Sequence, residues 1–113
     1  MDILIQADGV ILTDSLKDIV DEKIGRVEHY IPRALRARVH LRKVSAHPSP
    51  RQFVVHVICD LPHATINTEE SGPNVISALD LVAEKLEARV RKLKTARLAR
   101  RERENIHSRE KKD

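Results

Sequence analysis

The chain has 113 residues, of which 41% are apolar and 34% are charged, and this length is enough for one compact domain and too short for two. Lys and Arg outnumber Asp and Glu by 21 to 17, and no apolar run approaches the roughly 20 residues that would span a bilayer. The lone cysteine excludes an internal disulfide, and together with the lack of a membrane-spanning run it leads us to expect a soluble cytosolic protein. One Phe and one Tyr without Trp are too few aromatic side chains for a protein that binds single strands by stacking on their bases.

The first predicted elements are a strand over residues 3–7 and a helix over residues 14–30. The strand is a short apolar run that ends in a turn at residues 8–9, and we expect it to pair on both sides. Thr13 or Asp14 can cap the helix, and Pro32 closes the segment. The buried face of the helix follows from its apolar spacing and consists of Leu16, Ile19, Val20, Ile24 and Val27.

Three further strands are predicted over residues 36–42, 52–60 and 64–69. In the first of them, basic side chains alternate with apolar ones, which indicates one solvent-exposed basic face. A loop that contains Pro48 and Pro50 separates it from the next strand, because proline cannot donate to a sheet. That next strand places four side chains on the face expected under the helices: Phe53, Val55, Val57 and Cys59.

The last predicted element is a long amphipathic helix from Asn74 to about Arg103. At about 100° per residue its apolar side chains form one stripe, which consists of Val75, Leu79, Val82, Ala83, Leu86, Val90 and Leu93. Basic residues lie beside the stripe, and Asp80, Glu84 and Glu87 lie on the opposite flank. Residues 85–103 hold nine Lys and Arg against two Glu, a net charge of +7, whereas residues 1–84 sum to −3. The positive charge of the chain therefore comes from this helix.

The order of these elements is β-α-β-β-β-α, which predicts an α+β fold with two helices packed on one face of a four-stranded sheet. We assign residues 1–96 to this domain. Residues 97–113 mix Arg, Lys and Glu with few apolar residues, and we expect them to continue the helix and then to fray into a flexible tail.

Catalytic and metal sites have little support in the sequence. Six histidines and Cys59 lack the paired ligand spacing of a zinc site, and we expect Cys59 to be a core residue instead of a nucleophile. The carboxylates of the long helix share a polar flank without an apolar pocket to shift a pKa. We therefore expect neither an enzyme nor a cofactor or metal.

Two runs of the sequence carry a family resemblance: TDSLKDIVDEKI at residues 13–24 and ALDLVAEKLE at residues 78–87. Together with the order of the elements, they resemble the ribosome hibernation-promoting factor family, also called ribosome-associated translation inhibitors, over about residues 2–95. The resemblance implies a fold like that of a double-stranded-RNA-binding domain. It also implies binding to rRNA in the decoding channel of the small ribosomal subunit, which blocks mRNA and tRNA during stasis or stress.

The predicted RNA-binding residues all carry a basic side chain on a helix: Lys23, Arg26, Lys85, Arg89, Arg91, Lys92 and Arg100. The resemblance implies contacts for the first three and for Lys92. Ala88 stands where many family members have a basic residue, and its basic neighbours at 89 and 91 can compensate. From the residues alone, a basic row at i, i+4 and i+7 can follow a phosphate backbone and release counterions. Arg100 extends this row into the tail.

The resemblance further implies a short form, because no second, dimer-forming domain follows Asp113, and we expect a monomer in solution. Two other functions stay open. A general double-stranded-RNA binder would bind any duplex, and a protein-interaction module would use the apolar stripe to pair with a helical partner. The simplest alternative is a basic flank that is only solvated. The composition of the tail is compatible with obstructing or favouring the pairing of ribosomes.

Overall fold

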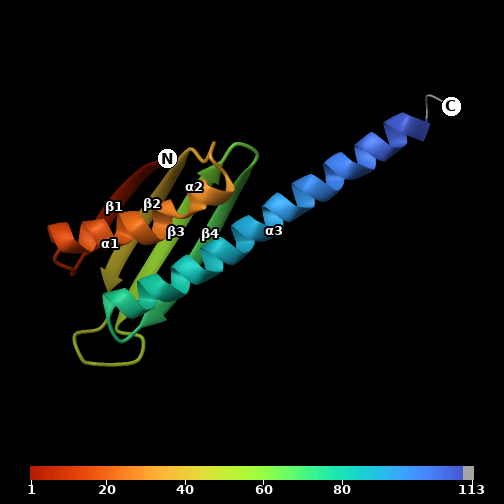
Figure 1. Cartoon of the computed structure of the whole chain (residues 1–113). Helices are drawn as coiled ribbons and strands as arrows, with labels where there is room; N and C mark the ends of the chain where they lie inside the picture. Colours follow the sequence, from red (N-terminus) through yellow and green to blue (C-terminus); the bar gives the residue numbers. More distant parts are fainter. Residues whose placement is uncertain (111–113) are drawn as a thin grey trace.

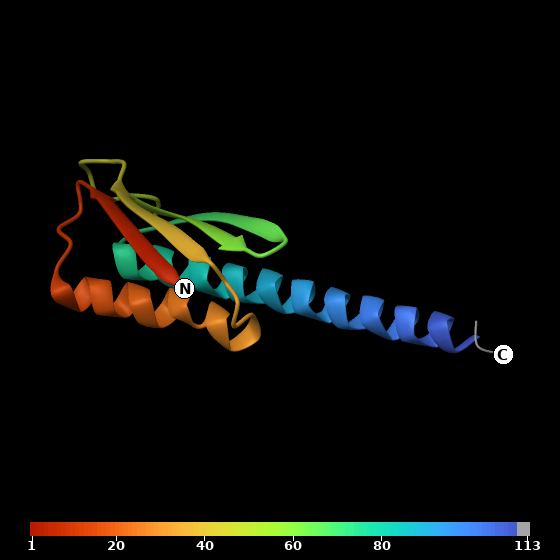
Figure 2. The same cartoon turned by 90° about the horizontal axis from the view of Figure 1, so that it is seen from above.

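The protein is a four-stranded sheet with helices on one face, as the computed structural model shows for the backbone of residues 1–110 and the side chains of residues 1–96. Strands β1 (Asp2–Asp8), β2 (Arg36–Lys43), β3 (Phe53–Leu61) and β4 (Ala64–Gly72) lie in the order β1-β2-β3-β4. Helices α1 (Asp14–Gly25), α2 (Val27–Tyr30) and α3 (Val75–Glu110) cover one face of this sheet (Figure 1 and Figure 2). The predicted α+β class and order of elements are confirmed.

Strand β1 is an edge strand, so the expectation that it pairs on both sides is wrong. It pairs in parallel with β2 alone, from Asp2 opposite Arg36 to Asp8 opposite Arg42. The other strands follow one another in antiparallel pairs. An apolar run does not distinguish an edge strand from a central one, because side chains point to the faces of the sheet and pairing is made by the backbone; Leu4 is in fact 53% exposed on the face away from the helices. Only alternate side chains of β1 pack on the core.

The first predicted helix is interrupted at Arg26, which separates α1 from the single turn of α2. Thr13 caps α1 as predicted, because its Oγ1 accepts the N–H of Leu16 at 3.1 Å. Gly25 is the last residue of α1, and glycine in a helix costs about 1 kcal/mol relative to alanine. The break therefore lies where the helix is intrinsically weakest.

Helix α3 begins after Asn74, whose Oδ1 accepts the N–H of Ser77 at 2.8 Å. It continues to Glu110, beyond the predicted end near Arg103. Residues 97–110 contain neither Gly nor Pro and are rich in strong helix formers, which accounts for the longer helix. In Figure 1 and Figure 2 the second half of α3 projects well beyond the sheet.

The core lies between the sheet and the inner faces of α1 and α3. Leu79, Val82, Leu86 and Val90 of the predicted stripe are buried, and α3 packs chiefly on β4 and β3. Each side chain of this kind stabilises the fold by about 1.5–3 kcal/mol when fully buried. From β3, Val55, Val57 and Cys59 are buried beneath the helices and Phe53 is half-buried, which confirms the predicted inner face of this strand.

Among the helices that the structure describes, none combines the length and the apolar character required to cross a membrane.

Candidate nucleic-acid interface

Lys85 and Arg89 lie on the flank of α3 that faces β4. The ammonium group of Lys85 pairs with Glu70, and Arg89 Nη1 donates to the backbone oxygen of Asn67 at 2.6 Å. Both side chains are nevertheless exposed to solvent. These two predicted RNA-binding residues thus hold α3 to the sheet and keep part of their charge and their donors accessible.

Lys23 and Arg26 lie on the other side of α3, in the layer formed by α1. Lys23 is three-quarters buried and pairs with Asp80 of α3, so it connects the two helices. Arg26 is half-exposed and lies 3.6 Å from Glu22, one turn earlier in the chain. The structure therefore does not bring these two residues together with Lys85, and it gives each of them a carboxylate partner.

A third group of basic residues lies where α3 leaves the sheet. Arg91, Lys92 and Lys94, which we call the exit cluster, are all exposed. Successive helical residues are about 100° apart, so these side chains point in different directions around the helix. Among the side chains of residues 1–96, none forms an ion pair with them. The exit cluster is the described part of α3 where positive charge is least neutralised.

Lys94 was absent from the predicted RNA-binding residues. The predicted residues of α3 are the row of Lys85, Arg89, Lys92 and Arg100, with Arg91 beside it, and Lys94 does not belong to that row. The available signal was the end of the apolar stripe at Leu93, because a helix without a buried stripe is accessible on all sides. Arg100 lies within α3, but its side chain is outside the described residues.

A hydrogen bond between α2 and α3 precedes the exit cluster. The hydroxyl group of Tyr30 donates to Glu87 Oε1 at 2.6 Å. This hydrogen bond raises the pKa of Tyr30 above its ordinary value, and burial and the negative charge of Glu87 act in the same direction. The bond therefore joins α2 to α3 just before the exit cluster.

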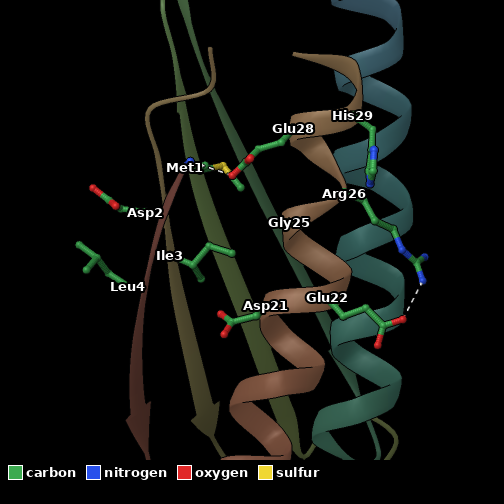
Figure 3. Close-up of a pocket in the computed structure, with 10 residues that line it drawn as sticks. All are labelled: Met1, Asp2, Ile3, Leu4, Asp21, Glu22, Gly25, Arg26, Glu28 and His29. Carbon is green, nitrogen blue, oxygen red and sulfur yellow. Dashed lines mark ion pairs between the residues drawn. The ribbon is translucent and has the colours of Figure 1, made fainter. Parts of the chain in front are cut away.

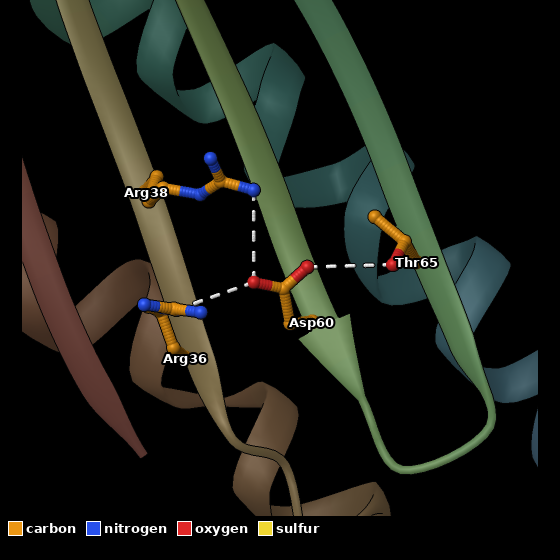
Figure 4. Close-up of polar contacts among 4 residues, drawn as sticks. All are labelled: Arg36, Arg38, Asp60 and Thr65. Atoms are coloured by element: carbon orange, nitrogen blue, oxygen red, sulfur yellow. Dashed lines mark hydrogen bonds and ion pairs between the residues drawn. The ribbon is translucent and has the colours of Figure 1, made fainter.

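The open face of the sheet carries the predicted basic strand, β2, but the guanidinium groups of this strand form ion pairs with carboxylates of β3 and β4. Arg36 Nε and Arg38 Nη2 lie 3.3 and 3.7 Å from the same oxygen of Asp60, whose other oxygen accepts the hydroxyl of Thr65 at 3.3 Å (Figure 4). Two guanidinium groups therefore share one carboxylate.

The same matching continues along β2. Arg42 Nη2 lies 3.8 Å from Glu69 of β4, and His40 contacts Asp8 of β1. Strand periodicity predicted the exposure of these residues but not the acidic residues beside them. Each guanidinium group of β2 on the open face therefore has a carboxylate within 4 Å, although two of them share Asp60, and the exit cluster is the better candidate for contact with phosphates.

No group of three or more His, Cys, Asp and Glu side chains is arranged to hold a metal ion within the described residues. Cys59 is fully buried in β3, as predicted for a core residue. Burial raises the pKa of its thiol to about 11, because the thiolate is poorly solvated there. This environment suits packing and opposes reactivity.

Residues 3–98 match the family model described as Sigma 54 modulation protein / S30EA ribosomal protein. A curated relative, the ribosome hibernation promotion factor of Staphylococcus aureus (strain COL), is 31% identical over 91 residues. The matched region is 80% of this chain and 47% of the relative, so the chain spans about half the length of that protein.

Two solved structures share the fold. The N-terminal domain of Thermus thermophilus Protein Y superposes with a TM-score of 0.72 at 24% identity, over 82% of this chain and 99% of that domain. A ribosomal subunit interface protein from Coxiella burnetii superposes with a TM-score of 0.72 at 21% identity, over 84% of this chain and 99% of the other. At these identities the likeness concerns the arrangement of helices and strands.

Proposed function

Because this chain belongs to the Sigma 54 modulation protein / S30EA ribosomal protein family, we propose that it is a ribosome-associated translation inhibitor. It acts in the cytoplasm on the small ribosomal subunit, where it contacts rRNA in the decoding channel. While it occupies that channel, mRNA and tRNA cannot bind. Inhibition of this kind needs a surface that fits the channel and no catalytic group.

The observation that carries the proposal is the exit cluster. Its three cations are exposed at the point where α3 leaves the sheet, without an ion-pair partner among the side chains of residues 1–96. A cation that already has a carboxylate partner must give it up to bind a phosphate, whereas these three lose only water and counterions. Each phosphate that they neutralise should add about one to the salt slope, which is the steepness with which the logarithm of the binding constant falls with the logarithm of the salt concentration.

The residues with partners have a secondary role in this proposal. Arg89 uses one guanidinium nitrogen for the carbonyl of Asn67, and its remaining donors can reach a phosphate. Lys85 is 58% exposed beside Glu70, so RNA can compete with that carboxylate. Lys23 and Arg26 extend the contact surface to α1, and Arg100 extends it along α3.

Co-sedimentation with isolated small and large ribosomal subunits across a salt series tests this proposal. Saturable, salt-sensitive pelleting with the small subunit alone is the expected result. Replacing the three residues of the exit cluster together by Gln should weaken that binding by about tenfold or more and should lower the salt slope by about two to three. The variant should fold normally, because none of the three side chains is buried.

A matched control removes the same amount of positive charge elsewhere. Lys17, Lys43 and Arg51 are exposed and lie outside α3, so their joint replacement by Gln should leave subunit binding close to that of the wild type. Equal losses in both variants would mean that net charge alone drives binding. Equal pelleting with both subunits would indicate a general RNA binder, and no pelleting at low salt would favour a protein-interaction module.

A further inference from the structure

The outer edge of β1 carries backbone groups that no other strand uses. The N–H of Asp2 donates to the oxygen of Leu35 at 3.2 Å, which shows that Asp2 directs its backbone toward β2. In a strand the direction of the N–H and C=O groups alternates from one residue to the next. The N–H and C=O groups of Ile3, Ile5 and Ala7 therefore point away from the sheet.

The two edges of the sheet differ in how they are covered. At the β4 edge, Arg89 of α3 donates to the carbonyl of Asn67 at 2.6 Å. At the β1 edge, no backbone or side-chain hydrogen bond from the described residues reaches Ile3, Ile5 or Ala7. An uncovered edge is a template on which another extended chain can form hydrogen bonds.

An open groove of about 790 Å³ lies beside this edge, between the first half of β1 and the end of α1 with α2 (Figure 3). Ile3 points from β1 toward α1, and Asp21 and Glu28 point from the helices toward β1 (Figure 3). Gly25 lies on the same wall, and a Cβ added there would meet no atom within 4 Å. The groove thus has room for a chain next to the free backbone groups.

The groove is acidic, although the whole chain has a net charge of +4. Three carboxylates face it, those of Asp21, Glu22 and Glu28; Glu22 lies 3.6 Å from Arg26 and Glu28 lies 2.7 Å from the α-amino group of Met1, whereas Asp2 points away from α1 (Figure 3). Asp21 in the groove and Asp2 on the opposite face of β1 are exposed and form no ion pair within the described residues. Two negative charges therefore remain for an incoming segment.

This charge disfavours a second copy of the same strand as the occupant. An antiparallel pair of β1 strands centred on Ile5 would place Asp2 of each copy opposite Asp8 of the other. Like charges directly opposite one another destabilise a strand pair. A basic segment meets the same carboxylates favourably.

We propose that the free edge of β1 and the acidic groove beside it bind an extended, Lys- and Arg-rich peptide segment by strand addition. Its backbone pairs with the outward N–H and C=O groups of Ile3, Ile5 and Ala7. Alternate side chains of an added strand point to opposite faces, so one set lies in the groove near Asp21 and the other lies near Asp2. The site is separate from the exit cluster, and the proposal does not depend on the ribosomal function.

A synthetic peptide of about eight alternating Lys and Val residues is a suitable probe, with a Glu and Val peptide as its counterpart. The Lys peptide should bind in a salt-sensitive manner and should slow hydrogen exchange of the amides of Ile3, Ile5 and Ala7, as measured by NMR. The Glu peptide should do neither. Failure of the Lys peptide to bind at low salt would overturn the proposal.

Two variants separate the backbone contribution from the charge contribution. Ala7→Pro removes one outward N–H without removing a bond to β2, which an edge strand tolerates, and should weaken peptide binding by about tenfold. Ala7→Val keeps the N–H and should bind as the wild type does. Asp2→Asn with Asp21→Asn leaves the backbone intact and should weaken binding and reduce its salt dependence. Unchanged peptide binding in the Ala7→Pro and Asp-to-Asn variants would overturn the proposal.

Small-subunit co-sedimentation of these variants should match the wild type, which keeps this test distinct from that of the proposed function. Analytical ultracentrifugation without peptide examines the competing occupant. A concentration-dependent dimer that protects the same three amides would mean that a second copy fills the edge, contrary to the proposal.

Discussion

Tyr30 is the only tyrosine of the chain, which has no tryptophan, so its ionisation can be followed by ultraviolet absorbance. The hydrogen bond to Glu87 raises its pKa above 10.0. Replacing Glu87 by Ala should therefore lower the pKa of Tyr30 toward 10.0, whereas Glu84→Ala, an exposed change on the same helix, should not. Equal pKa values in all three proteins would contradict the observed contact.

The same hydrogen bond makes a pH-dependent contribution to stability. Because the pKa of Tyr30 is raised in the folded protein, this contribution is present below pH 10.0 and is lost as the pH rises through the pKa of the folded state. Tyr30→Phe should therefore lower the midpoint of thermal unfolding at neutral pH. The difference from the wild type should shrink above pH 10.0, as measured by circular dichroism, and a constant difference would exclude the bond as its cause.

Two glycines should respond to alanine in opposite directions. At Gly25 a Cβ meets nothing within 4 Å, whereas at Gly72 it would lie 3.0 Å from the backbone nitrogen of Ala78. Gly25→Ala should stabilise the protein by about 0.5–1 kcal/mol, because alanine is the better helix former. Gly72→Ala should destabilise it through this close contact, and urea denaturation measures both. Destabilisation by Gly25→Ala would mean that the break between α1 and α2 needs the glycine.

At the scale of elements, α3 combines two roles that separate along its length. Its first half closes the core, and its basic flank is fastened to β4 by Lys85 and Arg89. Its second half projects beyond the sheet (Figure 2). A basic residue near the start of the projecting part can therefore bind a partner without contributing to the stability of the fold. A basic residue over the sheet can do both.

A pair of alanine substitutions distinguishes these roles. Arg89→Ala should destabilise the protein by about 1 kcal/mol, because the carbonyl of Asn67 loses its donor, while Lys92→Ala should change stability by less than about 0.5 kcal/mol. Both should weaken binding to the small subunit. Denaturation curves and co-sedimentation of the same samples provide the two readouts, and equal stability of the two variants would argue against a structural role for Arg89.

At the scale of the whole molecule, the shape follows from one helix. The protein measures 69 by 25 by 16 Å, and the long dimension runs along α3, whose second half projects beyond the sheet (Figure 1). The family match over residues 3–98 ends within that second half. It also confirms the family resemblance found in the sequence.

Ending the chain after residue 96 should preserve the fold, because among the side chains of residues 1–96 the last one that packs on the core is Leu93. Residues 97–113 contain seven Lys and Arg against four Asp and Glu, a net charge of +3. Their removal should therefore weaken binding to the small subunit and lower its salt slope. Thermal unfolding and co-sedimentation test the two halves of this prediction, and a loss of cooperative unfolding would show that the domain needs its extension.

The family resemblance, the order of the elements and most of the buried side chains could be predicted from the amino-acid sequence. Helix caps at Thr13 and Asn74 and the apolar periodicity of α3 are local features, and residues a few positions apart are enough to specify them. The predicted RNA-binding residues share this local origin, and they remain a prediction.

Which charges are neutralised and which strand edge is free could not be predicted in this way, because both depend on the packing of distant segments. Lys23 meets Asp80, Arg36 meets Asp60 and Lys85 meets Glu70, and no periodicity connects residues that far apart. The position of β1 at the edge likewise depends on the crossover that sets it beside β2 alone. Electrostatic and hydrogen-bond partners depend on distance in space, so the sequence shows where basic residues lie along a helix, and only the fold shows which of them have a carboxylate beside them.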